Sequence, residues 1–350
     1  MAITIKTIAD LVGVSHTTVY RVVNGHPGVK PELREKIIKI ATDLDYRPNT
    51  AARALRAANM SVKIGFLMPS FNQEFNDQVK EGIEAARDKY KNQGVEIIVR
   101  EMPEYTPEVQ ISMMNELAAE GVKGLSINPI DCWEVRMAID KLARRKIPVV
   151  AYNSDILGSK RICFVGPDNV VAGKVAASLV GKVRMGAGNI LLFSSNLQLL
   201  CSMQRIHHFK QLISERYPQM QIVDEVSVCE DDETAYNETK KALQQHPQID
   251  VIYINGGGGA GVVKCLKELR DENDILYVGH DLLCGVLTLT KDTDYVDFLI
   301  AQAPFKQGLY PVKVLVDYLL YDIPPAMDTI AMPVDIRMRY NMHIKEYDLT

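Results

Sequence analysis

The chain of 350 residues is long for a single domain, and its hydrophobic fraction of 47% is ample for a buried core. No run approaches the ~18 apolar residues of a membrane span, and the first residues lack the basic-then-apolar pattern of a signal peptide. We therefore expect a cytoplasmic protein with no membrane partner. Residues 1–60 carry nine Lys or Arg against five Asp or Glu, whereas residues 61–350 carry thirty-one against thirty-nine. This asymmetry predicts a small polyanion-binding module joined to an acidic body.

The segment 4–44 contains three predicted helices. Its first part has apolar residues at the i, i+3, i+4 and i+7 spacing of one helical face. Gly13 breaks this pattern, and Ser15 can cap a second helix over residues 16–24. A third helix begins at Pro31, a favoured first position. Two short helices joined by a glycine turn and braced by a third predict a helix-turn-helix head.

The outward face of the second helix has the side chains needed to read DNA. Arg21 can donate two hydrogen bonds to guanine, while Thr17 and His16 can reach base edges or thymine methyl groups. Tyr20 lies on the flank of this face. The alternative is a plain three-helix bundle with solvated polar faces, which explains any single residue better than it explains the whole arrangement.

The next stretch, "YRPNTAARALRAANM", predicts a short linker helix. Asn49 can cap it, and residues 50–58 are alanine-rich but too few for a helix that is stable alone. Its large apolar residue is Leu55, which is flanked by Arg53 and Arg56. Such a leucine can act as a wedge between base pairs in the minor groove. The alternative is that it packs on the following domain.

"TIKTIADLVGVSHTTVYRVVNG" followed by "YRPNTAARAL" resembles the head and hinge of the lactose-repressor (LacI) family of bacterial transcription regulators. The resemblance implies a homodimer that reads the two half-sites of a palindromic operator in double-stranded DNA. It further implies that the protein is bacterial and associated with the nucleoid. It also implies a hinge helix that folds on DNA and inserts Leu55. Tyr20 departs from the family, which usually has a small serine there. The residues expected to contact or support contact with DNA are Thr4, Lys6, Ser15, His16, Thr17, Tyr20, Arg21, Asn24, Asn49, Arg53 and Leu55.

Beyond residue 60, short apolar runs alternate with amphipathic helical stretches. This alternation predicts a doubly wound α/β body with parallel sheets, and its length predicts two lobes. The expected division is a head over 1–47, a hinge over 48–60 and an effector-binding body over 61–345. Within the body we expect an N-lobe from about 61–165 and 303–331 and a C-lobe from about 166–302 and 332–345.

Polar residues follow many of the predicted strands, at the end where such sheets bind ligands. Carboxylates, amides and an arginine suit hydrogen bonds with hydroxyl groups, and nearby aromatic rings suit the apolar face of a sugar. Each residue alone fits a turn or a helix cap equally well. Their recurrence at the same end of the strands predicts a pocket formed by Asn72, Phe75, Asn153, Asp155, Arg205, Asn255, Asp281 and Gln302.

The body also resembles the sensor domain of the same family, which is similar to type I periplasmic sugar-binding proteins. The segments that carry the likeness include "IGFLMPSFNQEFNDQVKEGIEAA", "IPVVAYNSD", "FVGPDNVVAGKVAA" and "YVGHD". By position, the resemblance assigns effector contacts to Asn72, Phe75, Asn153, Arg205, Asn255, Asp281 and Gln302, with Gln73 and Asp155 as further candidates. The sequence departs from the family at Glu74, where proline is common, at the glycines after Asn255, and at His280, where an aromatic residue is usual.

The glycine run in "VIYINGGGGAG" supports a competing hypothesis. Gly256, Gly258 and Gly261 satisfy G-x-G-x-x-G after a strand-like run, and Asp281 follows twenty residues later. This pattern is typical of an NAD(P)-binding oxidoreductase, but here many strands precede it. The glycines could instead leave room for a larger or anionic effector, or form a loop that merely tolerates glycine. We expect a transcription regulator, most simply a repressor, that is not an enzyme and uses no cofactor or metal.

Overall fold

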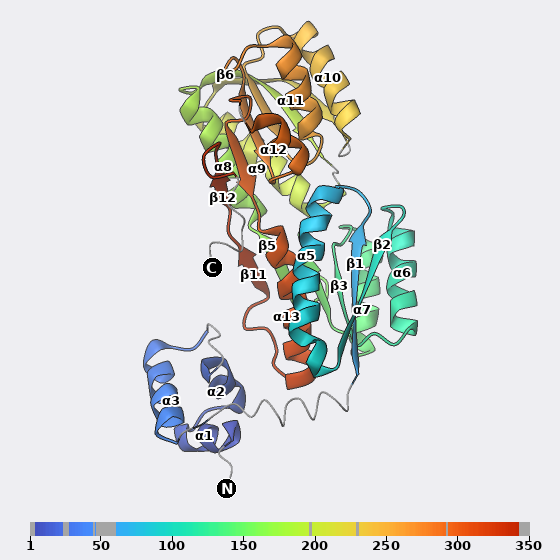
Figure 1. The fold of residues 1–350 in the computed structure, drawn as a ribbon, viewed down its shortest axis with the longest axis vertical. Coiled ribbons are helices and arrows are strands. Elements are labelled where there is room, and N and C mark those ends of the chain that lie inside the picture. The colour runs from blue at the N-terminus through green and yellow to red at the C-terminus, as the bar shows by residue number, and fades with distance from the viewer. Residues whose placement is uncertain are drawn as a thin grey trace.

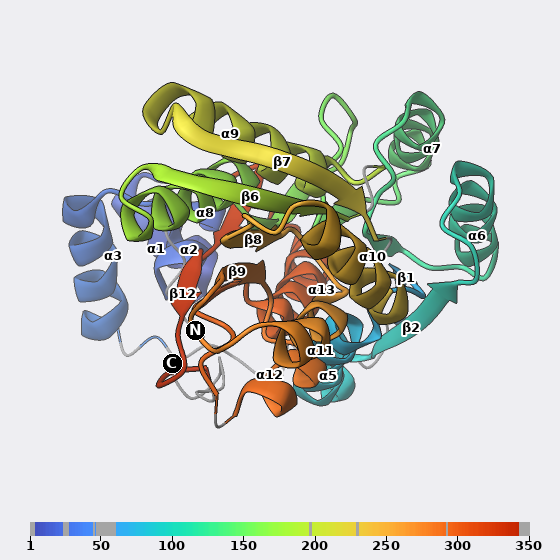
Figure 2. The same cartoon turned by 90° about the horizontal axis from the view of Figure 1, so that it is seen from above.

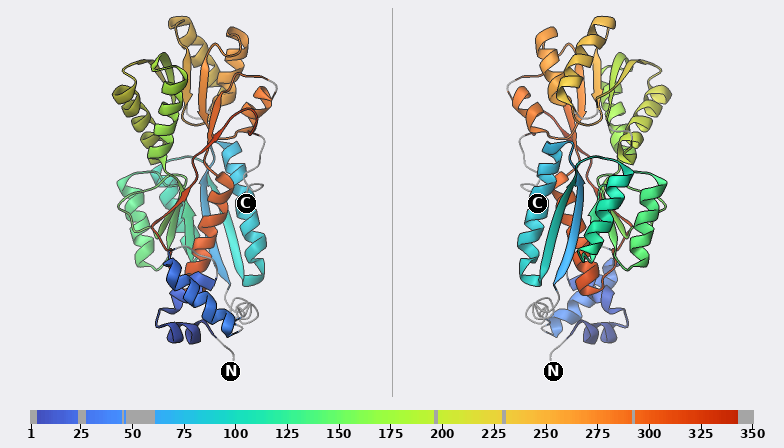
Figure 3. Two further views of the ribbon diagram at one scale, coloured as in Figure 1. Left: turned by 90° about the vertical axis from the view of Figure 1, so that its left-hand side faces the viewer. Right: turned by 90° about the vertical axis from the view of Figure 1, so that its right-hand side faces the viewer.

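The computed structural model of the chain describes residues 4–23, 28–44, 46, 61–195, 198–228, 231–291 and 293–342. It contains a small helical head and a two-lobed body, with the head beneath the N-lobe at the end opposite the C-lobe (Figures 1 and 3). The predicted fold class is confirmed. Among the residues so described, no helix combines the length and apolar character that a membrane span requires.

The head is the predicted three-helix unit. Its helices are α1 (Ile5–Val12), α2 (His16–Val23) and α3 (Pro31–Asp43). Thr4 caps α1 by accepting a hydrogen bond from the backbone N–H of Thr7 at 3.2 Å, and Gly13 ends α1 in the left-handed conformation. Ser15 accepts from the backbone N–H of Thr18 at 3.2 Å, as expected of the residue that starts α2. The head core consists of Ile8, Ala9, Val19, Val22 and Ile37.

The N-lobe is a six-stranded parallel sheet in the order β11-β5-β4-β3-β1-β2. Helices α5 and α13 cover one face and α6 and α7 the other (Figure 1). Its strands are β1 (Val62–Pro69), β2 (Val95–Met102), β3 (Gly124–Ile127), β4 (Val149–Tyr152), β5 (Cys163–Pro167) and β11 (Thr329–Met332). Its helices are α5 (Gln73–Tyr90), followed by the short η1 (Lys91–Gln93), α6 (Pro107–Ala119), α7 (Trp133–Arg144) and α13 (Pro304–Tyr321).

The C-lobe repeats this architecture with the order β12-β10-β9-β8-β6-β7, in which β12 alone pairs antiparallel. Figure 2 shows α9 and α10 on opposite sides of the sheet. The strands are β6 (Ala187–Ser194), β7 (Gln219–Ser227), β8 (Val251–Ile254), β9 (Leu276–His280), β10 (Phe298–Ala301) and β12 (Asp335–Arg337). The helices are α8 (Asn169–Val183), α9 (Leu200–Arg216), α10 (Asp232–Gln245), α11 (Gly259–Leu269) and α12 (Cys284–Thr290). The chain passes between the lobes after β5, β10 and β11.

Helices α5 and α13 lie unusually close together, side by side in Figure 1. A Cβ atom on Gly82 of α5 would lie 1.9 Å from the carbonyl oxygen of Phe305, and one on Gly308 of α13 would lie 2.0 Å from that of Val79. Each glycine therefore allows the backbone of the other helix to approach within a distance that no side chain permits.

Candidate functional site

A cavity lies between the lobes, where the carboxyl ends of both sheets face each other. This is the position expected for ligands of doubly wound sheets. Seven of the eight predicted pocket residues line it, and Asp155 does not. The full lining is Pro69, Phe71, Asn72, Phe75, Asn76, Asn128, Asn153, Ser195, Leu199, Cys201, Ser202, Arg205, Asn255, Gly256, Asp281 and Gln302.

A buried polar network crosses the C-lobe side of the cavity. The guanidinium of Arg205, on α9, donates to the side-chain oxygens of Asn169 at 2.8 Å and Gln302 at 2.5 Å. It also reaches the backbone oxygen of Asn255 at 3.4 Å. The amide nitrogen of Gln302 lies 2.8 Å from each carboxylate oxygen of Asp281. Gln302 thus links Arg205 and Asp281, the charged side chains among the described residues that line the cavity, and all three are at most 4% exposed.

Several cavity residues have left-handed backbone conformations shortly after the end of a strand. Asn72, Asn153 and Asp281 have φ angles of 52°, 60° and 69°. Asn and Asp tolerate this conformation better than other residues with a side chain. Asn72 also caps α5 by accepting from the backbone N–H of Phe75 at 3.4 Å. These residues can therefore form a turn and line the cavity at the same time, because the turn places each side chain beyond the end of its strand.

Three amide oxygens at the cavity lack a partner within the described part of the chain. The Oδ1 atoms of Asn128, Asn153 and Asn255 are buried there without a hydrogen bond. Asn255 is oriented by its Nδ2, which donates to the backbone oxygen of Ser202 at 3.3 Å. A buried acceptor without a donor costs free energy, and a ligand hydroxyl can supply that donor. Our sequence analysis missed Asn128, although it too follows a strand, β3.

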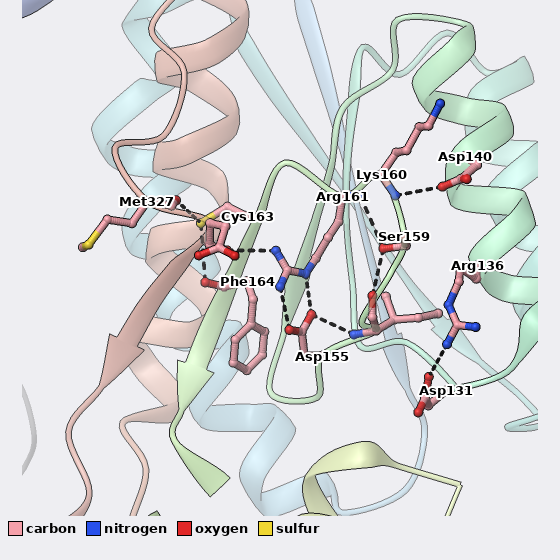
Figure 4. A network of polar contacts seen from close by, with 12 residues as sticks. Asp131, Arg136, Asp140, Asp155, Ser159, Lys160, Arg161, Cys163, Phe164 and Met327 are labelled. Atoms are coloured by element: carbon pink, nitrogen blue, oxygen red, sulfur yellow. Dashed lines mark hydrogen bonds and ion pairs between the residues drawn. The ribbon is translucent and has the colours of Figure 1, made fainter. Parts of the chain in front are cut away.

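Asp155 was wrongly placed in the pocket. Its carboxylate forms a two-point ion pair with Arg161, whose Nη2 lies 2.6 Å from Oδ2 (Figure 4). Arg161 also donates to the backbone oxygen of Asp328 at 2.8 Å. The carboxylate therefore holds Arg161 within the β4–β5 connection, and Arg161 joins this connection to the segment before β11. Asp155 is only two residues from Asn153 in the sequence, but Asn153 lines the cavity whereas the side chain of Asp155 contacts Arg161 outside it.

Hydrogen bonds also join the lobes around the cavity. The carboxylate of Glu74, on α5 of the N-lobe, accepts from the backbone N–H of Gly285 in the C-lobe at 3.0 Å. One helical turn later, Gln78 donates to the backbone oxygen of Leu282 at 3.1 Å. Glu74 is the residue that departs from the family's usual proline. These contacts exist only while the lobes lie together, so they stabilise that arrangement.

The glycine run packs α11 against α10. A Cβ on Gly261 would lie 1.8 Å from the backbone oxygen of Asp232. The carboxylate of Asp232 also accepts from the backbone N–H of Gly261 at 3.1 Å, so the start of α11 already has an anion. Gly258 has φ of 90°, which requires glycine. Of the run, Gly256 lines the cavity. Close packing explains the other two glycines of the motif better than a dinucleotide or a phosphate does.

Behind Asp281, His280 is 3% exposed and its Nε2 lies 3.0 Å from the hydroxyl of Tyr253. Burial lowers the pKa of His280 well below its usual value, and the cation of Arg205 lowers it further. His280 is therefore a neutral packing residue beneath the cavity. Across the described residues, no cluster of three or more His, Cys, Asp or Glu is placed to hold a metal ion.

The head presents part of its predicted DNA-reading surface. Lys6 and His16 are exposed and Thr17 is half-buried. Tyr20 and Arg21 contact the body, as described below. Four of the predicted contacts lie outside the described residues, namely Asn24, Asn49, Arg53 and Leu55.

Comparison with known proteins agrees with this architecture. The family model "Bacterial regulatory proteins, lacI family" matches residues 4–49, and "Periplasmic binding protein domain" matches residues 64–321. The chain is 26% identical over 308 residues to the HTH-type transcriptional regulator AglR of Rhizobium meliloti, covering 84% of this chain and 81% of that one. It is 28% identical over 292 residues to the HTH-type transcriptional regulator MalR of Clostridium butyricum, covering 79% and 82%.

The body has the fold of solved sugar-binding proteins. An ABC transporter solute-binding protein from Burkholderia graminis, in complex with D-arabinose, superposes with a TM-score of 0.74 at 22% identity. The superposition covers 81% of this chain and 97% of that one. With its helix-turn-helix head and its two-lobed body, the chain belongs to the lacI family of bacterial DNA-binding transcription regulators.

Proposed function

We propose that this regulator is a homodimeric repressor whose affinity for a palindromic operator is set by a neutral carbohydrate bound between its lobes. The recognition helix is α2, with Arg21 reading guanine and Thr17 and His16 contacting neighbouring bases. Leu55 inserts into the minor groove between the half-sites. Regulation of this kind needs no catalytic step, and the protein acts on DNA in the bacterial cytoplasm.

The observation that carries the effector assignment is the buried network of Arg205, Gln302 and Asp281 beside unpartnered amide oxygens. Asp281 and the free Oδ1 atoms are acceptors, which call for several hydroxyl donors on one small molecule. The fold relative from Burkholderia graminis is bound to such a molecule, D-arabinose. Asn72 and Asn153 supply polar side chains on the N-lobe side of the cavity, and Phe75 supplies an apolar surface for a sugar ring.

A phosphorylated or acidic sugar fits the cavity less well. The one arginine that lines the cavity already donates to Asn169, Gln302 and the backbone of Asn255. The nearest helix start in the glycine run is occupied by Asp232. An added anion would also lie close to the carboxylate of Asp281, and like charges repel strongly where water is excluded.

The test is a ligand screen by thermal shift and isothermal titration, followed by operator binding with each ligand found. The panel contains neutral pentoses and hexoses, their phosphates, sugar acids and the nicotinamide cofactors. A neutral sugar should raise the melting temperature and change operator affinity. Binding of NAD or NADP, with no sugar altering DNA affinity, would refute the proposed pocket and support the oxidoreductase hypothesis.

A further inference from the structure

Tyr20 of the recognition helix is buried, although it does not belong to the head core. It is 7% exposed, and it is not among the residues that form the core of the head. Its ring stacks on that of Tyr321, the last residue of α13, with centroids 6.1 Å apart and an interplanar angle of 29°. The side chain on the flank of the DNA-reading face is thus covered by the protein's own body.

Its neighbour Arg21 makes a second contact with the body. Nη2 of Arg21 donates to the backbone oxygen of Pro324 at 3.3 Å, in the loop that follows α13. Gly28, which follows α2 in the chain, lies against the same loop, since a Cβ placed on it would be 3.7 Å from the Cβ of Ala326. The head therefore meets the end of α13 and its following loop at three points, and two of them are on α2.

These contacts exclude DNA from the recognition helix. A helix that reads bases must place its outward face against the floor of the major groove. The guanidinium of Arg21 cannot lie on a guanine edge while it is held beside Pro324, because the body occupies the volume that the duplex would fill. Docking and DNA binding are therefore alternative states of one surface.

We propose that the docked head is an autoinhibited state, in which Tyr321 and the Pro324 loop mask Tyr20 and Arg21 and compete with the operator. The proposal rests on α2 being the recognition helix. It gives Tyr20 a role that the serine usual in the family cannot fill, because a serine has no ring to stack. If the docking equilibrium constant is K, the dissociation constant of any DNA rises by the factor 1 + K.

The size of the masking effect can be judged from the contact that a substitution on the body would remove. Among the described residues, the contacts between head and body include one aromatic pair and one hydrogen bond to a carbonyl oxygen. Losing the aromatic pair alone should improve DNA affinity about two- to tenfold. An inhibition of this size is small enough for the operator to overcome.

The decisive variants are on the body, because a change at Tyr20 or Arg21 would also alter DNA contacts. Tyr321→Ala and Tyr321→Leu both remove the ring, and leucine keeps an apolar side chain in place if the alanine variant is unstable. The hydroxyl of Tyr321 also lies 2.6 Å from Oε1 of Gln93. Gln93→Ala is therefore the matched control, since it removes that hydrogen bond and leaves the ring in place.

The measurement is fluorescence anisotropy of labelled operator and of random duplex with the full-length protein, after circular dichroism shows native folding. Tyr321→Leu should tighten both DNAs by the same factor, about two- to tenfold, while Gln93→Ala binds like the wild type. Unchanged or weaker binding by the folded leucine variant would overturn the proposal. A gain confined to the operator would also overturn it, because masking blocks all DNA alike. Absence of operator binding by the wild type would instead overturn the proposed function.

Discussion

Replacing Asp281 by asparagine should separate the ligand contacts of the cavity from its architecture. Asp281 has φ of 69°, a conformation that asparagine adopts as readily as aspartate. The substitution keeps the size of the side chain and one oxygen for Gln302, whose Nε2 lies 2.8 Å from both carboxylate oxygens. It removes the negative charge and turns one acceptor into a donor. The turn and the fold should therefore survive.

The expected loss follows from the hydrogen bonds that a sugar would make. A hydrogen bond to a charged acceptor contributes about 1.5–3 kcal/mol, against about 0.5–1.5 kcal/mol for a neutral one. If Asp281 accepts from two hydroxyls, the variant loses about 2–3 kcal/mol of binding free energy, which weakens the effector about 30- to 150-fold. Isothermal titration gives the effector affinity. When operator binding is measured at increasing effector concentration, the midpoint of the response should shift by the same factor.

The chain offers a matched control in Asp155, whose carboxylate pairs with Arg161 outside the cavity. Asp155→Asn makes the same chemical change and should leave the effector affinity unaltered. It should instead lower the free energy of unfolding by about 1–3 kcal/mol, because it weakens a nearly buried ion pair. If Asp281→Asn binds effector like the wild type, or if Asp155→Asn is the variant that loses it, the assignment of the pocket is wrong.

Four further predictions concern other parts of the molecule. Arg21→Ala should cost about 1–3 kcal/mol on the operator and relax preference at one base pair per half-site, and equal losses on random DNA in anisotropy would show a phosphate contact instead. Gly261→Ala should lower the melting temperature by several degrees, because its Cβ meets the backbone of Asp232, and should create no dependence on a nicotinamide cofactor. Glu74→Gln should weaken effector binding about two- to tenfold by loosening the contact between the lobes, whereas tighter binding would contradict that role. Because His280 is neutral in the fold and protonates when unfolded, chemical denaturation should show stability falling as the pH drops below about 6.5, and His280→Gln should reduce that slope.

The sequence predicted the features that depend on local pattern. Helical spacing, Gly13 and Ser15 were enough to predict the head, because caps and turns are set by neighbouring residues. The strand-end rule found Asn72 and Asp281, because parallel strands deliver their carboxyl ends to one edge. Applied to every strand, the same rule would have added Asn128.

The errors and omissions depend on residues distant in the chain. Asp155 follows a strand as Asn153 does, but it pairs with Arg161, which in turn donates to the distant backbone oxygen of Asp328. The packing of Gly261 depends on the approach of α10, which periodicity cannot reveal. Tyr20 looked like a bulkier flank of a DNA-reading helix, since its stacking partner lies about three hundred residues later.

The closely packed pair α5 and α13 has a mechanical consequence. Both helices begin beside the cavity, near Asn72 and Gln302, and α13 ends at the ring that covers Tyr20. Each has 18 residues, a span of about 27 Å. With glycine on each side of the crossing, neither helix can slide past the other without a collision between backbones. Because α13 ends at Tyr321, any shift of this pair of helices within the N-lobe would also move the ring that covers Tyr20.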